Sequence, residues 1–156
     1  MPKLYDYEIV LAKTQKYCAY QERCQWDVEQ KFREWEVDEE IRDDVLSDLI
    51  TQGFIHEQRF ALHYAGGHFR TKHWGKIKIE SELKFRQVSK YSIIKALENI
   101  SDEEYRLTLH NLIEKKISEV QAKNTFERNQ KIAQYLYAKG YESELIWKEL
   151  EIFTNE

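Results

Sequence analysis

The sequence predicts an all-helical protein built as three tandem three-helix repeats, which together form an elongated, curved array. Three observations predict this fold. Backbone breakers are rare, with one proline and five glycines among 156 residues, whereas Glu, Lys, Gln and Leu are abundant. Apolar residues recur at steps of three and four, which is the spacing of one helical face. The same apolar pattern returns with a period of about 50 residues, as tandem repeats do.

The repeat is visible in the apolar positions of residues 28–49. These are Val28, Phe32, Val37, Ile41, Val45, Leu46 and Leu49. A shift of 51 residues gives Ile79, Leu83, Val88, Ser92, Ala96, Leu97 and Ile100, and a further shift of 53 gives Ile132, Leu136, Tyr141, Leu145, Glu149, Leu150 and Phe153. Only Ser92 and Glu149 are polar in this alignment. We therefore expect repeats at residues 1–52, 53–100 and 101–156.

Each copy of the pattern is expected to form two helices joined by a short turn. Asp38 is the candidate N-cap after the first turn, and Ser89 is the candidate after the second. In the third copy, Gly140 can adopt the left-handed conformation that ends a helix, and Ser143 can cap the helix that follows.

Another helix is expected ahead of each pair, over residues 8–24, 57–69 and 102–123. Their expected core residues are Ile9, Leu11, Ala12, Tyr17 and Tyr20, then Phe60, Ala61, Tyr64, Ala65 and Phe69, then Tyr105, Leu109, Leu112, Ile113, Ile117 and Val120. Ser101 and Glu104 have the spacing of a capping box at the start of the third of these helices. Because a unit of about 50 residues buries little surface alone, we expect the stacked units to share one continuous core and present a long concave face.

The composition favours a cytoplasmic protein. No apolar run approaches the roughly 18 to 20 residues that cross a bilayer, and the first eight residues contain no apolar signal region. Cys18 and Cys24 are expected to be a reduced, structural pair. Trp26, Trp35 and Trp147 are expected to pack in the core rather than to stack on a ligand. An elongated monomer is the simplest expectation for the oligomeric state.

The charge is unevenly distributed along a chain of net charge −4. Residues 22–48 contain eleven acidic and four basic residues, a net charge of −7, whereas residues 68–90 contain seven basic and two acidic residues, a net charge of +5. We interpret the acidic stretch 34–48 mainly as a solvated helix face. The alternatives are a docking surface for a basic partner, or repulsion that keeps the protein off bare DNA.

The basic segment is the candidate contact surface for a partner or for DNA. Its candidate residues are Arg70, Lys72, Lys76, Lys78, Lys84 and Arg86, with Phe69, His73 and Trp74 among them. Cations interleaved with aromatic residues suit phosphates and unstacked bases, and they equally suit an acidic protein groove that holds DNA. The alternative is a solvated helix face with the aromatic residues in the core. On a helix that starts at Gly75, Lys76 and Lys78 would point away from Ile79 and Leu83 and be free to face a partner.

No pattern predicts catalysis, a metal site or a cofactor. His63, His68 and His73 are five residues apart, which fans them out around a helix by about 140° per step. Neither a His-Glu-x-x-His nor a Cys-x-x-Cys motif is present. Gly66 and Gly67 have no Walker pattern around them, and we expect them to permit close helix packing or a bend. No nucleophile–base arrangement can be argued, so the protein is expected not to be an enzyme.

Residues 53–83 resemble the RecX family. The family pattern is a glycine with two hydrophobic residues, then Asp-Glu-Arg-Phe-Ala, then Gly-Pro-x-x-Ile-x-x-Glu-Leu. The matching residues are Gly53, Glu57, Arg59, Phe60, Ala61, Gly75, Ile79, Glu82 and Leu83. His56 stands where an acid is usual, which should weaken a helix N-cap, and Lys76 stands where proline is usual, which makes the turn less rigid and more basic. Arg59 is expected to fix the start of its helix. The resemblance covers roughly residues 8–153 and is strongest in residues 53–100.

The resemblance implies three tandem three-helix repeats, which agrees with the spacing. It also implies binding in the helical groove of a filament of RecA recombinase on DNA, with reduced ATPase, strand-exchange and coprotease activity. The protein would then regulate recombination, DNA repair and the SOS response, with single-stranded DNA as a further partner. One alternative is a direct nucleic-acid-binding module whose helix pairs act as helix-turn-helix units, although the net charge argues against it. Another is a helical scaffold for an unrelated partner, which the architecture alone would permit.

Overall fold

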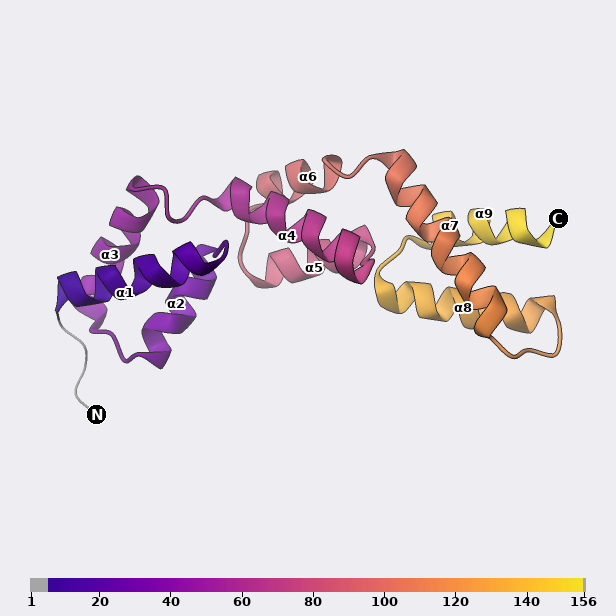
Figure 1. Cartoon of the computed structure of the whole chain (residues 1–156), viewed down its shortest axis with the longest axis horizontal. Helices are drawn as coiled ribbons and strands as arrows, with labels where there is room; N and C mark the ends of the chain where they lie inside the picture. The colour runs from indigo at the N-terminus through magenta and orange to yellow at the C-terminus, as the bar shows by residue number, and fades with distance from the viewer. Residues whose placement is uncertain (1–5, 156) are drawn as a thin grey trace.

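The computed structural model describes residues 6–155, and over this range it contains nine helices and no strand (Figure 1). The helices are α1 (Tyr7–Tyr20), α2 (Gln25–Glu34), α3 (Glu39–Thr51), α4 (Glu57–Lys72), α5 (Lys76–Phe85), α6 (Lys90–Glu98), α7 (Asp102–Glu119), α8 (Thr125–Lys139) and α9 (Ser143–Thr154). Three groups of three helices follow one another along the long axis of the molecule, and we call them the first, second and third units. The predicted fold class is confirmed. Residues 1–5, which make up most of the segment expected to lack a signal region, lie outside the described residues.

The three units share a backbone feature at their helix–helix turns. Glu36, Gln87 and Gly140 have φ angles of 53°, 61° and 97°, and they are separated by the same 51 and 53 residues as the apolar pattern. In each turn the next residue donates its N–H to the carbonyl of the residue five positions earlier. The three bonds are Val37 to Phe32 (2.9 Å), Val88 to Leu83 (3.1 Å) and Tyr141 to Leu136 (3.1 Å). The repeat is therefore a repeat of backbone conformation as well as of apolar residues.

The two polar members of the repeat alignment also occupy core positions. Ser92 is 4% exposed and Glu149 is 3% exposed. The Ser92 hydroxyl donates to Glu57 at 3.2 Å, and the Glu149 carboxylate lies 3.1 Å from both Arg106 and His110. Because each buried polar group has a partner, these positions tolerate a departure from the apolar pattern.

The prediction for the first helix is wrong in its end and in part of its buried face, since only Leu11 and Tyr17 of the five expected core residues pack against the core. The helix ends at Tyr20 rather than near residue 24, and its buried residues are Val10, Thr14 and Cys18. Ile9 and Tyr20, which were expected in the core, are 55% and 82% exposed. The buried threonine is accommodated because its hydroxyl donates to the carbonyl of Val10 at 2.6 Å. By contrast, all five expected core residues of α4 are buried.

The predicted caps are confirmed at Ser89 and Ser101, whose side chains accept from the backbone N–H groups of Ser92 and Glu104. Asp38 occupies the N-cap position of α3, but its side chain makes no capping bond. The prediction for Ser143 is wrong, because α9 begins at Ser143 and the residue before it is the N-cap.

The cap at the start of α4 is not weakened as expected. His56 accepts the backbone N–H of Arg59 through Nδ1 at 3.0 Å, so it takes the place of an acidic cap. Arg59 supports the same helix start, since its guanidinium donates to the carbonyl of Gly53 at 2.9 Å. The expected role of Arg59 at the helix start is confirmed.

The expectation of one continuous core is correct only for the second and third units. Their buried residues form a single cluster, which Cys24 of the first unit also joins. The first unit has a separate core, which includes Cys18 and Ile55. Both cysteines are buried and unbonded, and burial raises the pKa of Cys18 to about 11 and of Cys24 to about 12. Since a thiolate is the reactive form, both are structural residues, as predicted.

Trp26, Trp35 and Trp147 are half-buried against these cores, which confirms their predicted packing role. Gly66 and Gly67 lie inside α4, which continues through them. A Cβ at Gly66 would meet only the Arg70 side chain, and one at Gly67 would meet nothing. The prediction that this pair allows close helix packing is therefore wrong.

Candidate partner-binding surface

The second and third units are joined backbone to backbone. The N–H of Gly75 donates to the carbonyl of Lys139 at 2.7 Å, and the N–H of Ile77 donates to the carbonyl of Gly140 at 2.9 Å. The Tyr141 hydroxyl adds a bond to the carbonyl of His73 at 2.9 Å. These bonds connect the turn before α5 to the turn before α9, so the two units form one stiff body.

Two glycines make this close approach possible. A Cβ at Gly75 would lie 2.3 Å from the carbonyl carbon of Gly140, and a Cβ at Gly140 would lie 2.6 Å from the backbone nitrogen of Lys78. Both distances are far shorter than van der Waals contact. The family-motif glycine at position 75 is therefore required by the joint between units.

Tyr105 of α7 completes the joint. Its hydroxyl accepts the N–H of Lys76 at 2.9 Å and donates to Glu142 at 2.5 Å. Burial raises the pKa of Tyr105, and the hydrogen bond to Glu142 raises it further, so the hydroxyl keeps its proton at ordinary pH. A proline at position 76, as in the family pattern, would have no N–H to donate.

The six basic candidates do not form one surface. Arg70 pairs with Glu104 of the third unit at 3.2 Å, and Lys84 pairs with Glu80 on its own helix at 2.9 Å. Lys76 lies over the Tyr105 ring, with 4.9 Å between its Nζ and the ring centroid. Lys76 and Lys78 are half-buried beside the joint rather than fully exposed, so only part of each side chain can face a partner.

The remaining three candidates surround a group of aromatic rings. His68 stacks between Tyr64, at a centroid distance of 3.9 Å, and Trp74, at 4.5 Å. Lys72 and Lys78 lie 5.5 and 4.6 Å from the Trp74 ring, and Arg86 lies 5.0 Å from the Tyr64 ring. We call these six residues the aromatic–basic cluster: Tyr64, His68, Lys72, Trp74, Lys78 and Arg86.

Sequence reasoning missed the part played by Tyr64 and His68. Tyr64 was assigned to the core, and His68 was considered only as a metal ligand. The spacing of Tyr64, His68 and Lys72 at steps of four was the available signal, because such residues share one face of a helix. Trp74 comes from the turn after α4, where His73 ends the helix with a φ of 58°.

Five residues of the aromatic–basic cluster, all except Lys78, line a cleft of about 750 Å³ between the first and second units. Glu22, Arg23 and Asp27 line the opposite wall. Arg86 is fixed there by Glu82 at 3.0 Å, and it also lies 5.8 Å from the Trp26 ring. The wall formed by the second unit combines Lys72 and Arg86 with planar rings, and its one acidic residue, Glu82, pairs with Arg86, so the chemistry of this wall suits anions and flat groups.

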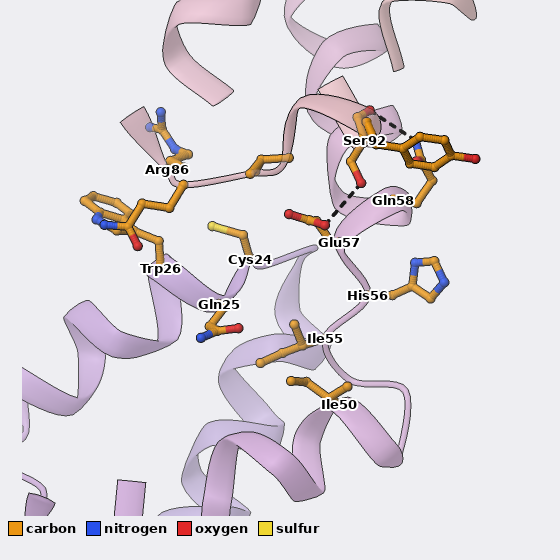
Figure 2. Close-up of a pocket in the computed structure, with 13 residues that line it drawn as sticks. Cys24, Gln25, Trp26, Ile50, Ile55, His56, Glu57, Gln58, Arg86 and Ser92 are labelled. Atoms are coloured by element: carbon orange, nitrogen blue, oxygen red, sulfur yellow. Dashed lines mark hydrogen bonds between the residues drawn. The ribbon is translucent and has the colours of Figure 1, made fainter. Parts of the chain in front are cut away.

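A second pocket, of about 490 Å³, lies at the same border between units (Figure 2). Glu57 points into it and accepts hydrogen bonds from the Ser89 N–H (2.7 Å), the Ser89 hydroxyl (3.1 Å) and the Ser92 hydroxyl (3.2 Å). Arg59 pairs with Glu22 of the first unit at 2.6 Å. The family-motif residues Glu57 and Arg59 therefore have structural roles. Glu57 connects segments of the second unit, and Arg59 connects the second unit to the first.

The other family-motif residues are mostly buried. Phe60, Ala61, Ile79 and Leu83 belong to the core shared by the second and third units. Among residues 6–155, no three potential ligand side chains come together as a metal site would require. No helix in that part of the chain has the length and apolar character needed to cross a membrane.

Acid should destabilise the protein through His68. Burial lowers the pKa of His68 from 6.5, and Lys72 and Arg86 lower it further, although its hydrogen bond to the Tyr64 carbonyl opposes the shift. The unfolded chain therefore takes up this proton first, and the free energy of unfolding should fall as the pH drops below about 6.5. Denaturant unfolding at several pH values should show a weaker fall for His68→Phe than for the wild type. Equal curves for the wild type and His68→Phe would contradict the assignment.

Comparison with known proteins finds family models and curated relatives that match this chain. A family model described as "RecX, second three-helix domain" matches residues 57–97, and one described as "RecX, third three-helix domain" matches residues 103–150. Curated proteins named "Regulatory protein RecX" from Bacillus cytotoxicus and Bacillus cereus are each 28% identical over 155 residues. Each alignment covers 98% of this chain, which spans only 57% of the length of these relatives.

Solved structures share the fold. A crystal structure of a regulatory protein RecX superposes with a TM-score of 0.84 at 23% identity, covering 96% of this chain and 73% of the other. The crystal structure of RecX from Lactobacillus salivarius gives a TM-score of 0.85 at 21% identity, covering 96% and 97%. At this identity the superpositions show the common architecture.

Proposed function

The chain belongs to the RecX family, and from this premise we propose that it is a cytoplasmic, non-enzymatic regulator that binds in the groove of the RecA–DNA filament. Bound there, it would reduce the ATPase and strand-exchange activities of RecA. The relatives are named regulatory proteins, which supports the regulatory role. We also propose that the protein acts as an elongated monomer with repeats at residues 1–52, 53–100 and 101–156.

The observation that carries the proposal is the aromatic–basic cluster beside the inter-unit cleft. Lys72 is exposed and lines the cleft together with Arg86, and Lys78 lies 4.6 Å from the Trp74 ring of the same cluster. The body is long (Figure 1), and its charge is unevenly distributed along the chain, which suits an extended groove better than a small molecule. Cations and aromatic rings together suit a filament surface that contains both acidic protein groups and phosphates.

The direct test measures ATP hydrolysis by RecA on single-stranded DNA while this protein is titrated in. The expected result is a progressive loss of ATPase activity, together with co-sedimentation of the protein with RecA filaments. Unchanged ATPase activity and no co-sedimentation would refute the proposal.

Charge reversal at Lys72 and Lys78 should weaken the inhibition. We expect K72E/K78E to raise the half-inhibitory concentration by about tenfold, which corresponds to a loss of about 1.4 kcal/mol of binding free energy. Arg86 is left unchanged, since it is held by Glu82 and packs against the Tyr64 ring. The matched control is K115E/K123E, which makes the same charge change at exposed positions of the third unit. Equal inhibition by K72E/K78E and the wild type, with both proteins folded, would remove the cluster from the contact surface.

The competing function is direct binding of nucleic acid by the helix pairs. It requires tight binding to bare DNA with a steep dependence on salt. A gel-shift series at rising salt, with and without RecA, separates the two functions. Weak binding to bare DNA with strong binding to the filament supports the regulator, and tight binding to bare DNA supports the alternative.

A further inference from the structure

The first unit carries a second surface of cations and aromatic rings, although residues 22–48 have a net charge of −7. This surface is a shallow hollow of about 760 Å³ formed by α1, the end of α2 and the segments that follow them. We call it the basic–aromatic face, and we define it by Lys13, Lys16, Tyr17, Tyr20, Arg23, Lys31 and Trp35. Within the described part of the chain, no acidic residue lines it.

The cations of this face rest on aromatic rings. Lys13 lies 4.3 Å from the Trp35 ring centroid, and Arg23 lies 3.9 Å from that of Tyr17. Among residues 6–155, no carboxylate lies within 4.0 Å of the charged groups of Lys13, Lys16 or Arg23. An anion can therefore approach these groups without breaking an ion pair.

Tyr20 is the most exposed large hydrophobic residue among those described, at 82%. It ends α1, and its nearest cationic neighbour, Arg23, lies 6.0 Å from its ring centroid. The ring is thus open to stacking, and the only aliphatic residue beside it on this face is Ala19. A face of rings without large aliphatic side chains suits planar bases better than the mixed side chains of a peptide.

Arg23 connects this face with the aromatic–basic cluster. It lines both the hollow on the first unit and the inter-unit cleft, whose opposite wall contains Lys72, Trp74 and Arg86. Cations and rings therefore follow one another from α1, through Arg23, to the end of α4, with Glu22 and Asp27 beside Arg23 on the wall of the cleft. Such a path suits an extended, charged strand.

We propose that the basic–aromatic face binds single-stranded nucleic acid. Lys13, Lys16 and Arg23 bind successive phosphates, and Tyr20 stacks on a base. That the bound strand is part of the RecA–DNA filament rests on the proposed function. Binding of the strand itself depends only on the residues of this chain and can be measured without RecA. The acidic first unit thus contributes directly to the strand contact.

The test measures the fluorescence anisotropy of a labelled oligothymidylate titrated with the intact chain in the absence of RecA. We expect weak binding that Tyr20→Ala lowers by about tenfold. We expect K13E/K16E to reduce the slope of log K against log salt by about 1.4, since each phosphate contact to a single strand contributes about 0.7. The controls are Tyr91→Ala, another exposed tyrosine, and K115E/K123E, and both should bind like the wild type.

Several outcomes would overturn the inference. It fails if Tyr20→Ala and K13E/K16E bind like the wild type, or if no oligonucleotide binds at low salt. It also fails if an acidic peptide binds this face and K13E/K16E weakens that binding while Tyr20→Ala has no effect on the oligonucleotide, because the face would then bind protein. The RecA ATPase result does not enter this test, so failure here and failure of the proposed function can be told apart.

Discussion

Replacing Gly140 with alanine should lower the free energy of unfolding by about 4 kcal/mol. Two costs combine at this position. Its φ of 97° is a conformation that L side chains rarely adopt, with a cost of about 1 to 2 kcal/mol. The added Cβ would also lie 2.6 Å from the backbone nitrogen of Lys78, and overpacking of this kind costs about 1 to 3 kcal/mol. The measurement is equilibrium denaturation in urea.

The other glycines provide matched controls that separate these costs. At Gly53, whose φ is 82°, an alanine would be strained, but its Cβ would contact no other atom. We therefore expect Gly53→Ala to lower the free energy of unfolding by about 1 kcal/mol. At Gly75, the backbone is not strained, but the added Cβ would clash with the backbone of Gly140. We therefore expect Gly75→Ala to lower the free energy of unfolding by about 2 to 3 kcal/mol. Gly67→Ala has neither and should stabilise α4 by about 0.5 to 1 kcal/mol. If Gly140→Ala lowered the free energy of unfolding no more than Gly53→Ala, the joint between the units would have room for the added Cβ, and the close backbone contact would be contradicted.

Removing the hydroxyl of Tyr105 should lower the free energy of unfolding by about 2 kcal/mol. Tyr105→Phe leaves the N–H of Lys76 without its acceptor and the Glu142 carboxylate without its donor. Tyr141→Phe removes one bond, to the carbonyl of His73, and should cost only about 1 kcal/mol. Urea denaturation of both variants gives the comparison.

The Lys76 bond can be tested through the family's usual proline. Lys76→Pro removes the N–H that Tyr105 accepts, so it should cost less in the Tyr105→Phe background than in the wild type. Position 76 is the first residue of α5, where proline is otherwise well tolerated. Equal costs in the two backgrounds would mean that the bond contributes nothing to the joint.

The positions of the helices could be predicted from the sequence because helix formation depends on spacing within a few turns. The caps at Ser89 and Ser101 and the left-handed Gly140 follow from local chemistry, and the structure confirms them. The repeat period could also be recognised despite the polar residues Ser92 and Glu149, because the six or seven apolar positions in each copy were enough to align the copies. The family resemblance was recognised from motif residues of the second unit, and several of these residues are buried in its core.

What the sequence by itself determined was thus the number, order and repeat of the helices. Only the tertiary structure decided which side chains share a surface. Lys76 and Lys78 looked free because periodicity describes one helix at a time, whereas the backbone of Gly140, over 60 residues away along the chain, packs beside them. The basic–aromatic face was hidden for the same reason: Lys13 of α1 meets Trp35, at the end of α2, only after the two helices fold together. Local spacing is set by the geometry of one helix, but the contacts between helices depend on pairs of residues whose separation along the chain carries no signal.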